Sequence, residues 1–204
     1  MHMITLISGK DGSPLWILGG KLNQFADLSG GNATNFAWQH DSRFFENETM
    51  LTLFDNHVSV TAANQTANCS RGMRVRLDYA KKTASLLAEY YHPNSLQSGA
   101  MGSYQSLPSG NVLTGWGTNP TFAEFTDKGE PVMNVQLGQL GSATNPVFVY
   151  RAYKLEWVGI PTWPPNIAAV PGPLANSSTN ATVYMSWNGA TELASWALVR
   201  SILS

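Results

Sequence analysis

The sequence is short of cysteine, of charge and of long apolar runs, and each shortage excludes a class of protein. Its one cysteine, Cys69, can neither form a disulfide within the chain nor build a cysteine zinc site, and the four histidines lack metal-ligand spacing. We therefore expect no metal. Charged residues are 12% of the 204, and the formal net charge of −1 argues against a nucleic-acid partner held through its phosphates. No apolar run approaches the ~18 residues of a membrane-spanning helix.

Motifs of cofactor-dependent enzymes are also missing. The chain has no GxxxxGK[ST] or GxGxxG segment that would bind phosphates or a dinucleotide. It has no GxSxG segment typical of a serine hydrolase either. We therefore expect no cofactor.

Aromatic and turn-forming residues are abundant instead. The chain has 7 Trp, 7 Tyr, 8 Phe, 18 Gly and 11 Pro, which favours β-strands joined by turns. Segments 40–56 and 102–117 both read as strand, turn and strand, and they begin 62 residues apart, at 40 and 102. Alternating apolar residues around Asp-containing turns predict further hairpins, at 7–20, 74–93 and 122–138.

Two adjacent hairpins make about four strands per module, repeated about every 60 residues, which is the pattern of a β-propeller blade. A β-sandwich or an open meander remains as an alternative. The prediction is thus all-β, with about three blades of a propeller over residues 1–157. Propellers close with about four to eight blades, so we expect the others to be missing from this chain. Residues 158–181 read as an extended connector rich in Pro, Asn and Ser, and 182–204 as the start of a truncated C-terminal β region.

Six asparagines occupy the acceptor pattern for N-glycosylation, which has meaning only in a secreted chain. The first residues, MHMITLISGKDGSP, lack the basic and apolar regions of a signal peptide. We expect a secreted, extracellular glycoprotein whose natural start precedes Met1 or of which this chain is a fragment, and a membrane-anchored full-length form stays open. The predicted acceptors are Asn32, Asn47, Asn64, Asn68, Asn176 and Asn180.

A set of short motifs, in order along nearly the whole chain, resembles the fungal arylsulfotransferase family. The resemblance implies a longer, secreted protein with a six-bladed propeller. Bacterial relatives of that family move a sulfuryl group from one phenol to another without a nucleotide donor, using a histidine on the inner wall of the propeller. The motifs are LWILGGK (15–21), WQHDSRF (38–44), LFDN (53–56), SRG (70–72), YHP (91–93), LPSGNVLTGWG (107–117), YRAY (150–153), GIPTWPP (159–165) and SWNGATELASW (186–196).

The resemblance makes His40 and Arg71 the candidate catalytic residues. A neutral imidazole can accept and release a sulfuryl group or act as acid or base near pH 7, and Asp41 can orient it. Guanidinium groups bind the oxygens of a spread negative charge, which makes Arg43 a second cation for the group. Asp41 and Arg43 are therefore candidate substrate-binding residues. The structural alternatives are a His-Asp pair that locks loops, an ion pair of Arg43 within its blade, and a surface role for Arg71.

The second module supplies the candidate substrate-binding residues Tyr104, Gln105 and Trp116. The glycines beside Trp116 could clear space for an aromatic ligand, while the alternative is packing inside the blade. We interpret His92 as a packing or capping residue, His57 as an exposed loop histidine, and the YRAY aromatic-cationic cluster as structural stacking. The position corresponding to His40 one module later, in residues 102–105, has no histidine, unlike the bacterial relatives.

The function most in keeping with these residues is sulfuryl transfer between phenolic compounds, with a phenol or aryl sulfate as partner and the missing blades completing the fold. The rival interpretations are a non-catalytic propeller that binds a phenol, quinone or glycan, and a cell-surface interaction module. The missing second histidine favours these rivals. We also expect the isolated chain to be marginally stable, because two sheet edges would be unpaired.

Overall fold

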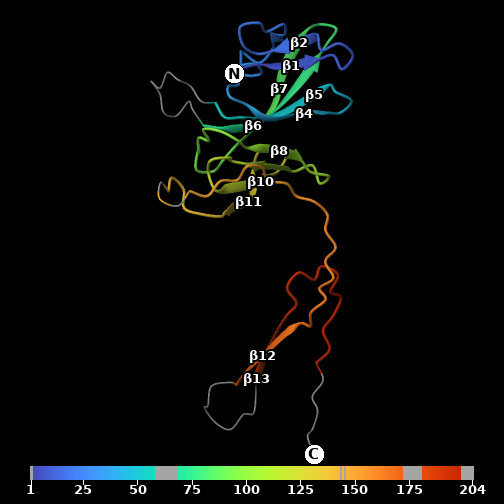
Figure 1. Cartoon of the computed structure of the whole chain (residues 1–204), viewed down its shortest axis with the longest axis vertical. Coiled ribbons are helices and arrows are strands. Elements are labelled where there is room, and N and C mark those ends of the chain that lie inside the picture. The colour runs from blue at the N-terminus through green and yellow to red at the C-terminus, as the bar shows by residue number, and fades with distance from the viewer. Residues whose placement is uncertain (1, 58–68, 143, 145, 172–180, 199–204) are drawn as a thin grey trace, which may run out of the picture. The chain divides into compact units, whose positions relative to one another are not determined.

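The computed structural model describes residues 2–57, 69–142, 144, 146–171 and 181–198, and every regular element within these ranges is a β-strand (Figure 1). The prediction of an all-β chain is confirmed. The chain divides into two compact units, Met1–Lys154 and Leu155–Ser204, each described here by itself. In the described part of the chain, no helix is long and apolar enough to cross a membrane.

The middle of the first unit is an antiparallel meander of four strands, in which each strand pairs with the next one along the chain. A short strand, β3 (Ala26–Asp27), joins its far edge in parallel with β7. The predicted strand-turn-strand patterns of 40–56 and 74–93 are both confirmed within it. The four strands are β4 (His40–Phe45), β5 (Met50–Asp55), β6 (Arg71–Asp78) and β7 (Thr83–Tyr91).

A second four-stranded meander follows it in the chain and confirms the hairpins predicted at 102–117 and 122–138. The remaining predicted hairpin, at 7–20, is the pair β1 (Ile4–Ile7) and β2 (Pro14–Leu18). All five predicted hairpins are therefore present. The strands of the second meander are β8 (Ser103–Ser106), β9 (Val112–Gly115), β10 (Thr121–Phe125) and β11 (Pro131–Gln136).

The first meander is buried on both faces, so the unit has two cores. All six residues of β5 are buried, as expected for a strand covered on both sides. Leu51 and Leu53 join the core shared with the β1–β2 hairpin. Phe54, from the opposite face, packs on Trp116 at 5.8 Å between ring centroids in the core shared with the second meander. Because β5 is apolar on both faces, it packs against the β1–β2 hairpin on one side and against the second meander on the other.

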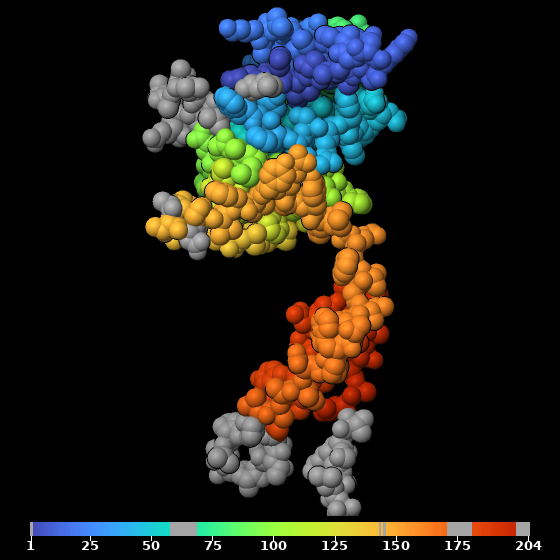
Figure 2. All heavy atoms as spheres, in the orientation of Figure 1, coloured from blue at the N-terminus to red at the C-terminus, as the bar shows by residue number. Residues whose placement is uncertain are grey.

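The segment 149–154 runs beside the outer edge of β8 and adds a third chain segment to the junction. The Gly102 N–H donates to the Tyr150 carbonyl at 3.2 Å, and the Ala152 N–H donates to Ser103 Oγ at 2.9 Å. The side chain of Gln105 donates to the carbonyl and accepts from the N–H of Lys154, at 2.9 and 2.8 Å. Figure 2 shows this segment, in orange, lying against the green strands of the second meander.

The second unit differs from the predicted connector because part of that segment is a strand. β12 (Asn166–Pro171) pairs with β13 (Ala181–Ser186) in an antiparallel hairpin. β13 lies where the sequence predicts the start of a C-terminal β region, at residues 182–204. The prolines that precede β12 led us to predict a connector there, because Pro favours turns and extended segments.

Glycine at position 102 is required by both backbone and packing. Its φ is +108°, where side chains are strained, and a Cβ there would collide with the ring of Phe54. We expect Gly102→Ala to lower the free energy of unfolding by about 2–5 kcal/mol, from the left-handed φ and the overpacked core. Urea unfolding of the chain measures this loss.

Gly110→Ala is the matched control. Its φ is +87°, but nothing lies within 4 Å of the position of its Cβ. It should lose about 1 kcal/mol from the backbone conformation alone. Equal losses in the two variants would show that the contact with Phe54 is not what requires glycine.

Candidate functional site

His40 lies at the start of β4 and contacts the chain through both ring nitrogens. Its Nδ1 lies 2.9 Å from the Trp38 carbonyl oxygen and 2.8 Å from Asn56 Oδ1. Both partners are acceptors, so Nδ1 carries the proton. The Met101 N–H donates to Nε2 at 3.3 Å. The ring is therefore held as the neutral Nδ1–H tautomer, with its Nε2 lone pair weakly engaged.

The partners of His40 join the two meanders. Asn56 is fully buried, and its amide donates to the carbonyls of Ser98 and Met101 at 2.9 and 3.0 Å. Ser70, also buried, donates to the Asn56 carbonyl at 2.9 Å and accepts from the Ser98 N–H at 2.7 Å. These bonds hold the 98–101 segment, which leads into β8, against the end of β5. The histidine thus lies between the sheets, where its hydrogen bonds connect loops of the two meanders.

Asp41 occupies a bulge in β4. The register with β5 shifts between His40 and Arg43, and Asp41 has a positive φ of 52°. A bulge changes the direction of the side chain at that point of a strand. The carboxylate is buried, with its Oδ2 accepting from the Tyr104 N–H at 3.2 Å and its Oδ1 accepting from Arg43 Nε at 2.8 Å. Asp41 therefore contacts Arg43 and β8, whereas His40 contacts Trp38, Asn56 and Met101. Contrary to the expectation from the sequence, the contacts of Asp41 do not orient the His40 ring.

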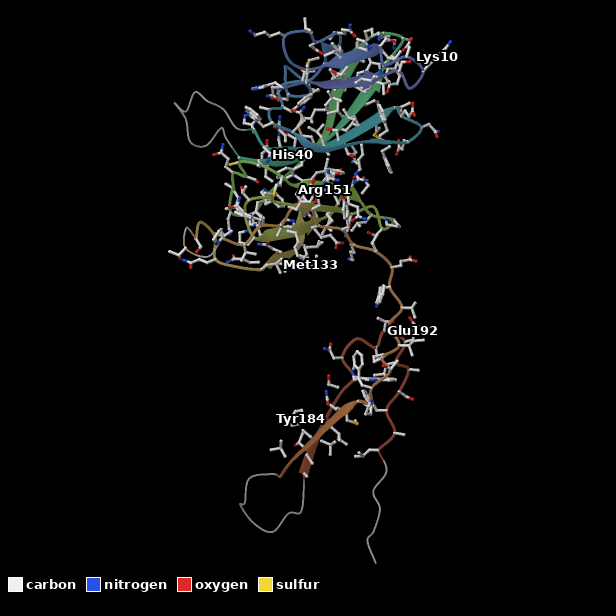
Figure 3. All side chains as sticks on the ribbon, viewed as in Figure 1. Lys10, His40, Met133, Arg151, Tyr184 and Glu192 are labelled. Carbon is white, nitrogen blue, oxygen red and sulfur yellow. The ribbon has the colours of Figure 1, made fainter. Side chains whose placement is uncertain are left out.

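Two arginines, Arg43 and Arg151, meet at Asp41, and we call them the arginine pair. Arg151 Nη1 lies 3.4 Å from Asp41 Oδ1. The hydroxyl of Tyr153 accepts from Arg43 Nη2 at 2.6 Å and from Arg151 Nη1 at 3.4 Å. The hydrogen bond to Asp41 raises the pKa of Arg43, so the guanidinium stays charged. Figure 3 shows His40 and Arg151 near the junction of the two meanders.

The arginine pair carries surplus positive charge at the surface. Two guanidiniums face one carboxylate, and their side chains are 52% and 34% exposed for Arg43 and Arg151, against 2% for Asp41. Solvent-facing N–H groups of such a pair can bind the oxygens of a sulfuryl group. The interpretation of YRAY as a stacking cluster covers only part of this arrangement. Its stacking is present, with Arg151 over the Tyr150 ring at 5.2 Å, but the approach of Arg43 comes from tertiary structure.

Arg71, one of the two predicted catalytic residues, is engaged within the protein. Its buried guanidinium donates to Asp55 Oδ2 at 2.9 Å, to Asn35 Oδ1 at 2.6 Å and to Glu89. Burial lowers its pKa and the charge of Asp55 raises it, with a net rise. Two carboxylates balance this cation, so it has no surplus charge for an anion. Arg71 borders a cleft of about 460 Å³ with His57 and Tyr91, and it does not join the arginine pair's contacts.

The glycine after Arg71 serves packing. A Cβ on Gly72 would lie 2.8 Å from Thr114 Cγ2 and 2.9 Å from the Tyr104 ring. The structure assigns the space to two side chains of the second meander.

The three predicted substrate-binding residues of the second module have structural contacts. Tyr104 and Trp116 are buried in the core between the meanders, where they pack on protein side chains, and burial raises the pKa of Tyr104. Gln105 binds the backbone of Lys154 with both ends of its amide. The glycines around Trp116 therefore leave room for protein, since a Cβ on Gly117 would collide with the Ala100 carbonyl.

Of the two other histidines with a predicted role, His92 agrees with its prediction and His57 does not. His92 is buried, with Nδ1 accepting from the Asn94 N–H at 3.1 Å and the ring edge-on to Trp116, which agrees with a packing and capping role. Burial lowers its pKa. His57, expected to be exposed, is instead half-buried beside Asp55 Oδ2 at 3.3 Å, because the turn after β5 folds back on that carboxylate.

The predicted glycosylation sites are only partly within the described structure. Asn32 and Asn47 are exposed in turns. Asn64, Asn68, Asn176 and Asn180 lie outside the described residues. Within the ranges that the structure covers, no group of three His, Cys, Asp or Glu side chains could hold a metal ion.

A family model matches most of the chain. Residues 1–138 match the model of a family described as Arylsulfotransferase (ASST). This range contains His40, Asp41, Arg43 and Arg71, while Arg151 and Tyr153 follow it. No curated protein matches the chain.

We expect Asp55→Asn to lower the free energy of unfolding by about 3–5 kcal/mol. Asp55 is fully buried and accepts from the N–H groups of Ala37 and His57 and from Arg71. The amide keeps the shape but leaves the Arg71 cation with one fewer carboxylate, and breaking a buried ion pair costs about this much. Chemical unfolding measures the loss. The control, Asp78→Asn, removes an exposed pair with Lys81 and should lose much less. Similar losses would contradict a structural role for Arg71.

Proposed function

Because the chain belongs to the arylsulfotransferase family, we propose that it is part of an enzyme that transfers sulfuryl groups between phenolic compounds by way of a histidine. The observation that carries the proposal is the arginine pair. It presents surplus positive charge, partly exposed, from Arg43 on the strand that begins with His40 and from Arg151 next to it. A phenol or aryl sulfate is the expected partner.

Arg43 and Arg151 are proposed to hold the sulfuryl oxygens. Asp41 takes part of their hydrogen-bonding capacity and orients them, and their exposed N–H groups remain for the ligand. The group in transfer carries negative charge spread over three oxygens, which suits planar guanidiniums with fixed donors. Arg71 is not proposed for this role, because Asp55, Glu89 and Asn35 already engage it.

His40 is proposed as the histidine of the reaction, as nucleophile or as general acid and base. The proton on Nδ1 is held by Trp38 and Asn56, which leaves the reactive lone pair on Nε2. To react, Nε2 must release the Met101 N–H, a contact of 3.3 Å. That contact is long for a hydrogen bond.

The two meanders are proposed to be neighbouring blades of a six-bladed propeller. Sequential pairing of four strands is the pattern of a blade, and β4, β8 and the 149–154 segment succeed one another as inner strands would. Blades outside this chain would close the ring. We further propose that the protein is secreted and glycosylated, with Asn32 and Asn47 as the exposed acceptors in the described structure.

A non-catalytic binding propeller is the second candidate. It is favoured by the hydrogen bonds at both ring nitrogens of His40, which are those of a structural histidine. In this alternative, the arginine pair binds an anionic phenol derivative and no group is transferred.

The test follows sulfuryl transfer from 4-nitrophenyl sulfate to a phenol by the complete protein that contains this chain. Arg43→Lys and Arg151→Lys should each lower kcat/KM by about 100- to 1000-fold, as loss of one charge-stabilising donor does. His40→Ala should lower it by about 1000-fold or more.

Arg76→Lys is the matched control, an exposed arginine of β6, and should keep the rate of the parent protein. Full activity in His40→Ala would exclude a role for that histidine. Binding of the aryl sulfate without turnover in the parent protein would favour the binding propeller.

A further inference from the structure

The arginine pair lies beside an exposed aromatic side chain, that of Tyr150. This residue is 64% exposed, and the guanidinium of Arg151 lies 5.2 Å from the centroid of its ring. The same guanidinium forms the ion pair with Asp41 Oδ1 at 3.4 Å. Because the face of an aromatic ring attracts a cation, the Tyr150 ring is held next to a group that we propose binds the sulfuryl oxygens.

The backbone around this ring is fixed against the second meander. The Val149 N–H donates to the Gly117 carbonyl at 2.8 Å, and the Tyr150 carbonyl accepts from the Gly102 N–H at 3.2 Å. Val149 is buried, whereas Tyr150, the next residue, is exposed. A side chain on a fixed backbone loses less conformational freedom when a ligand binds, and this preorganisation favours binding.

Three other aromatic residues near the junction are engaged by the protein. Trp116 and Tyr104 are buried in the core between the meanders. The hydroxyl of Tyr153 accepts from both arginines, and the Arg43 guanidinium lies over its ring at 5.4 Å. Tyr153 therefore positions the arginine pair. Of these four aromatic residues, Tyr150 is the most exposed.

An aryl sulfate has the chemical groups that this arrangement would bind. A single oxygen joins its sulfur to its aromatic ring, so a guanidinium that binds the sulfuryl oxygens has the aryl ring close by. The Tyr150 ring lies next to the same guanidinium. Two aromatic rings attract each other in offset or edge-on arrangements. An alkyl sulfate has the same anionic oxygens but gains nothing from such a ring.

We propose that Tyr150 is a specificity-determining residue, which binds the aryl ring of the sulfate donor while the arginine pair binds its sulfuryl oxygens. The inference rests on the proposed function of the arginine pair, and it names the residue that selects an aromatic ligand over an aliphatic one. It assigns no covalent step to Tyr150, and the histidine keeps its proposed role. Sulfonates are suitable probes, because they carry the anionic oxygens on a C–S bond that sulfuryl transfer does not break.

The experiment measures the binding of benzenesulfonate and of methanesulfonate to the complete protein that contains this chain, by titration calorimetry. The parent protein should bind benzenesulfonate about 10-fold more tightly, which corresponds to the gain from one aromatic pair. Tyr150→Ala should raise the Kd of benzenesulfonate about 10-fold and change that of methanesulfonate less than about 2-fold. Tyr150→Phe retains the ring, and it should keep the preference for benzenesulfonate.

Tyr91→Ala is the matched control, because Tyr91 is an exposed tyrosine beside the cleft that Arg71 borders. It should bind both sulfonates as the parent protein does. Loss of the preference in Tyr91→Ala instead of Tyr150→Ala would place the aryl ring at that cleft and overturn the inference. Equal weakening of both sulfonates in Tyr150→Ala would overturn it too, since Tyr150 would then only position Arg151.

The proposed function is tested separately by transfer from 4-nitrophenyl sulfate. A parent protein that prefers benzenesulfonate through Tyr150 but transfers no sulfuryl group would overturn the enzyme and keep the aryl-binding residue. A parent protein that transfers the group but binds the two sulfonates equally would overturn the role of Tyr150 and leave the enzyme intact.

Discussion

The arrangement at the junction of the two meanders depends on one buried carboxylate, that of Asp41. Its oxygens accept from the Tyr104 N–H on β8 and from Arg43 on its own strand, and they form an ion pair with Arg151 on the segment beside β8. A buried carboxylate must be paired, so three separate chain segments converge on it. The bulge that turns Asp41 inward also directs Arg43 to the same point. The charge that a ligand would meet is therefore set by a residue that the ligand does not touch.

The arginines of the first unit show how one residue type can serve structure or remain available to a ligand. The buried guanidinium of Arg71 donates hydrogen bonds to two carboxylates and an amide, so it stabilises the first meander. Arg43 and Arg151 share a single carboxylate at the surface and retain donors for a ligand. His40 stands between these cases, because the groups that fix its tautomer also connect the sheets. Whether such a residue has a structural role or stays available to a ligand depends on the charges of its partners and on its exposure. The residue type alone does not decide it.

Most of the fold could be predicted from sequence because its signals are local. Alternation of apolar residues around turns such as TDKGE located all five hairpins, since hairpin pairing needs only neighbouring residues. The near-continuous apolar run of β5 is likewise a local sign of a strand buried on both faces. β12 was missed because prolines precede it and its alanines carry weak strand preference, and only pairing with β13 stabilises it. Whether the meanders belong to a closed propeller depends on contacts beyond one hairpin, so it stays a prediction.

By itself, the sequence determined the strand content, the order of hairpins and the family resemblance of the motif around His40, because these follow from periodicity and residue type along the chain. Only the tertiary structure decided which arginines have more positive charge than their carboxylate partners balance. Arg43 and Arg151 are 108 residues apart in the numbering, and no spacing rule brings them to Asp41. Likewise, burial turned Trp116 and Tyr104 from candidate ligand contacts into core. Solvent exposure and charge matching arise from distant segments packing together, so they cannot be read from the local pattern.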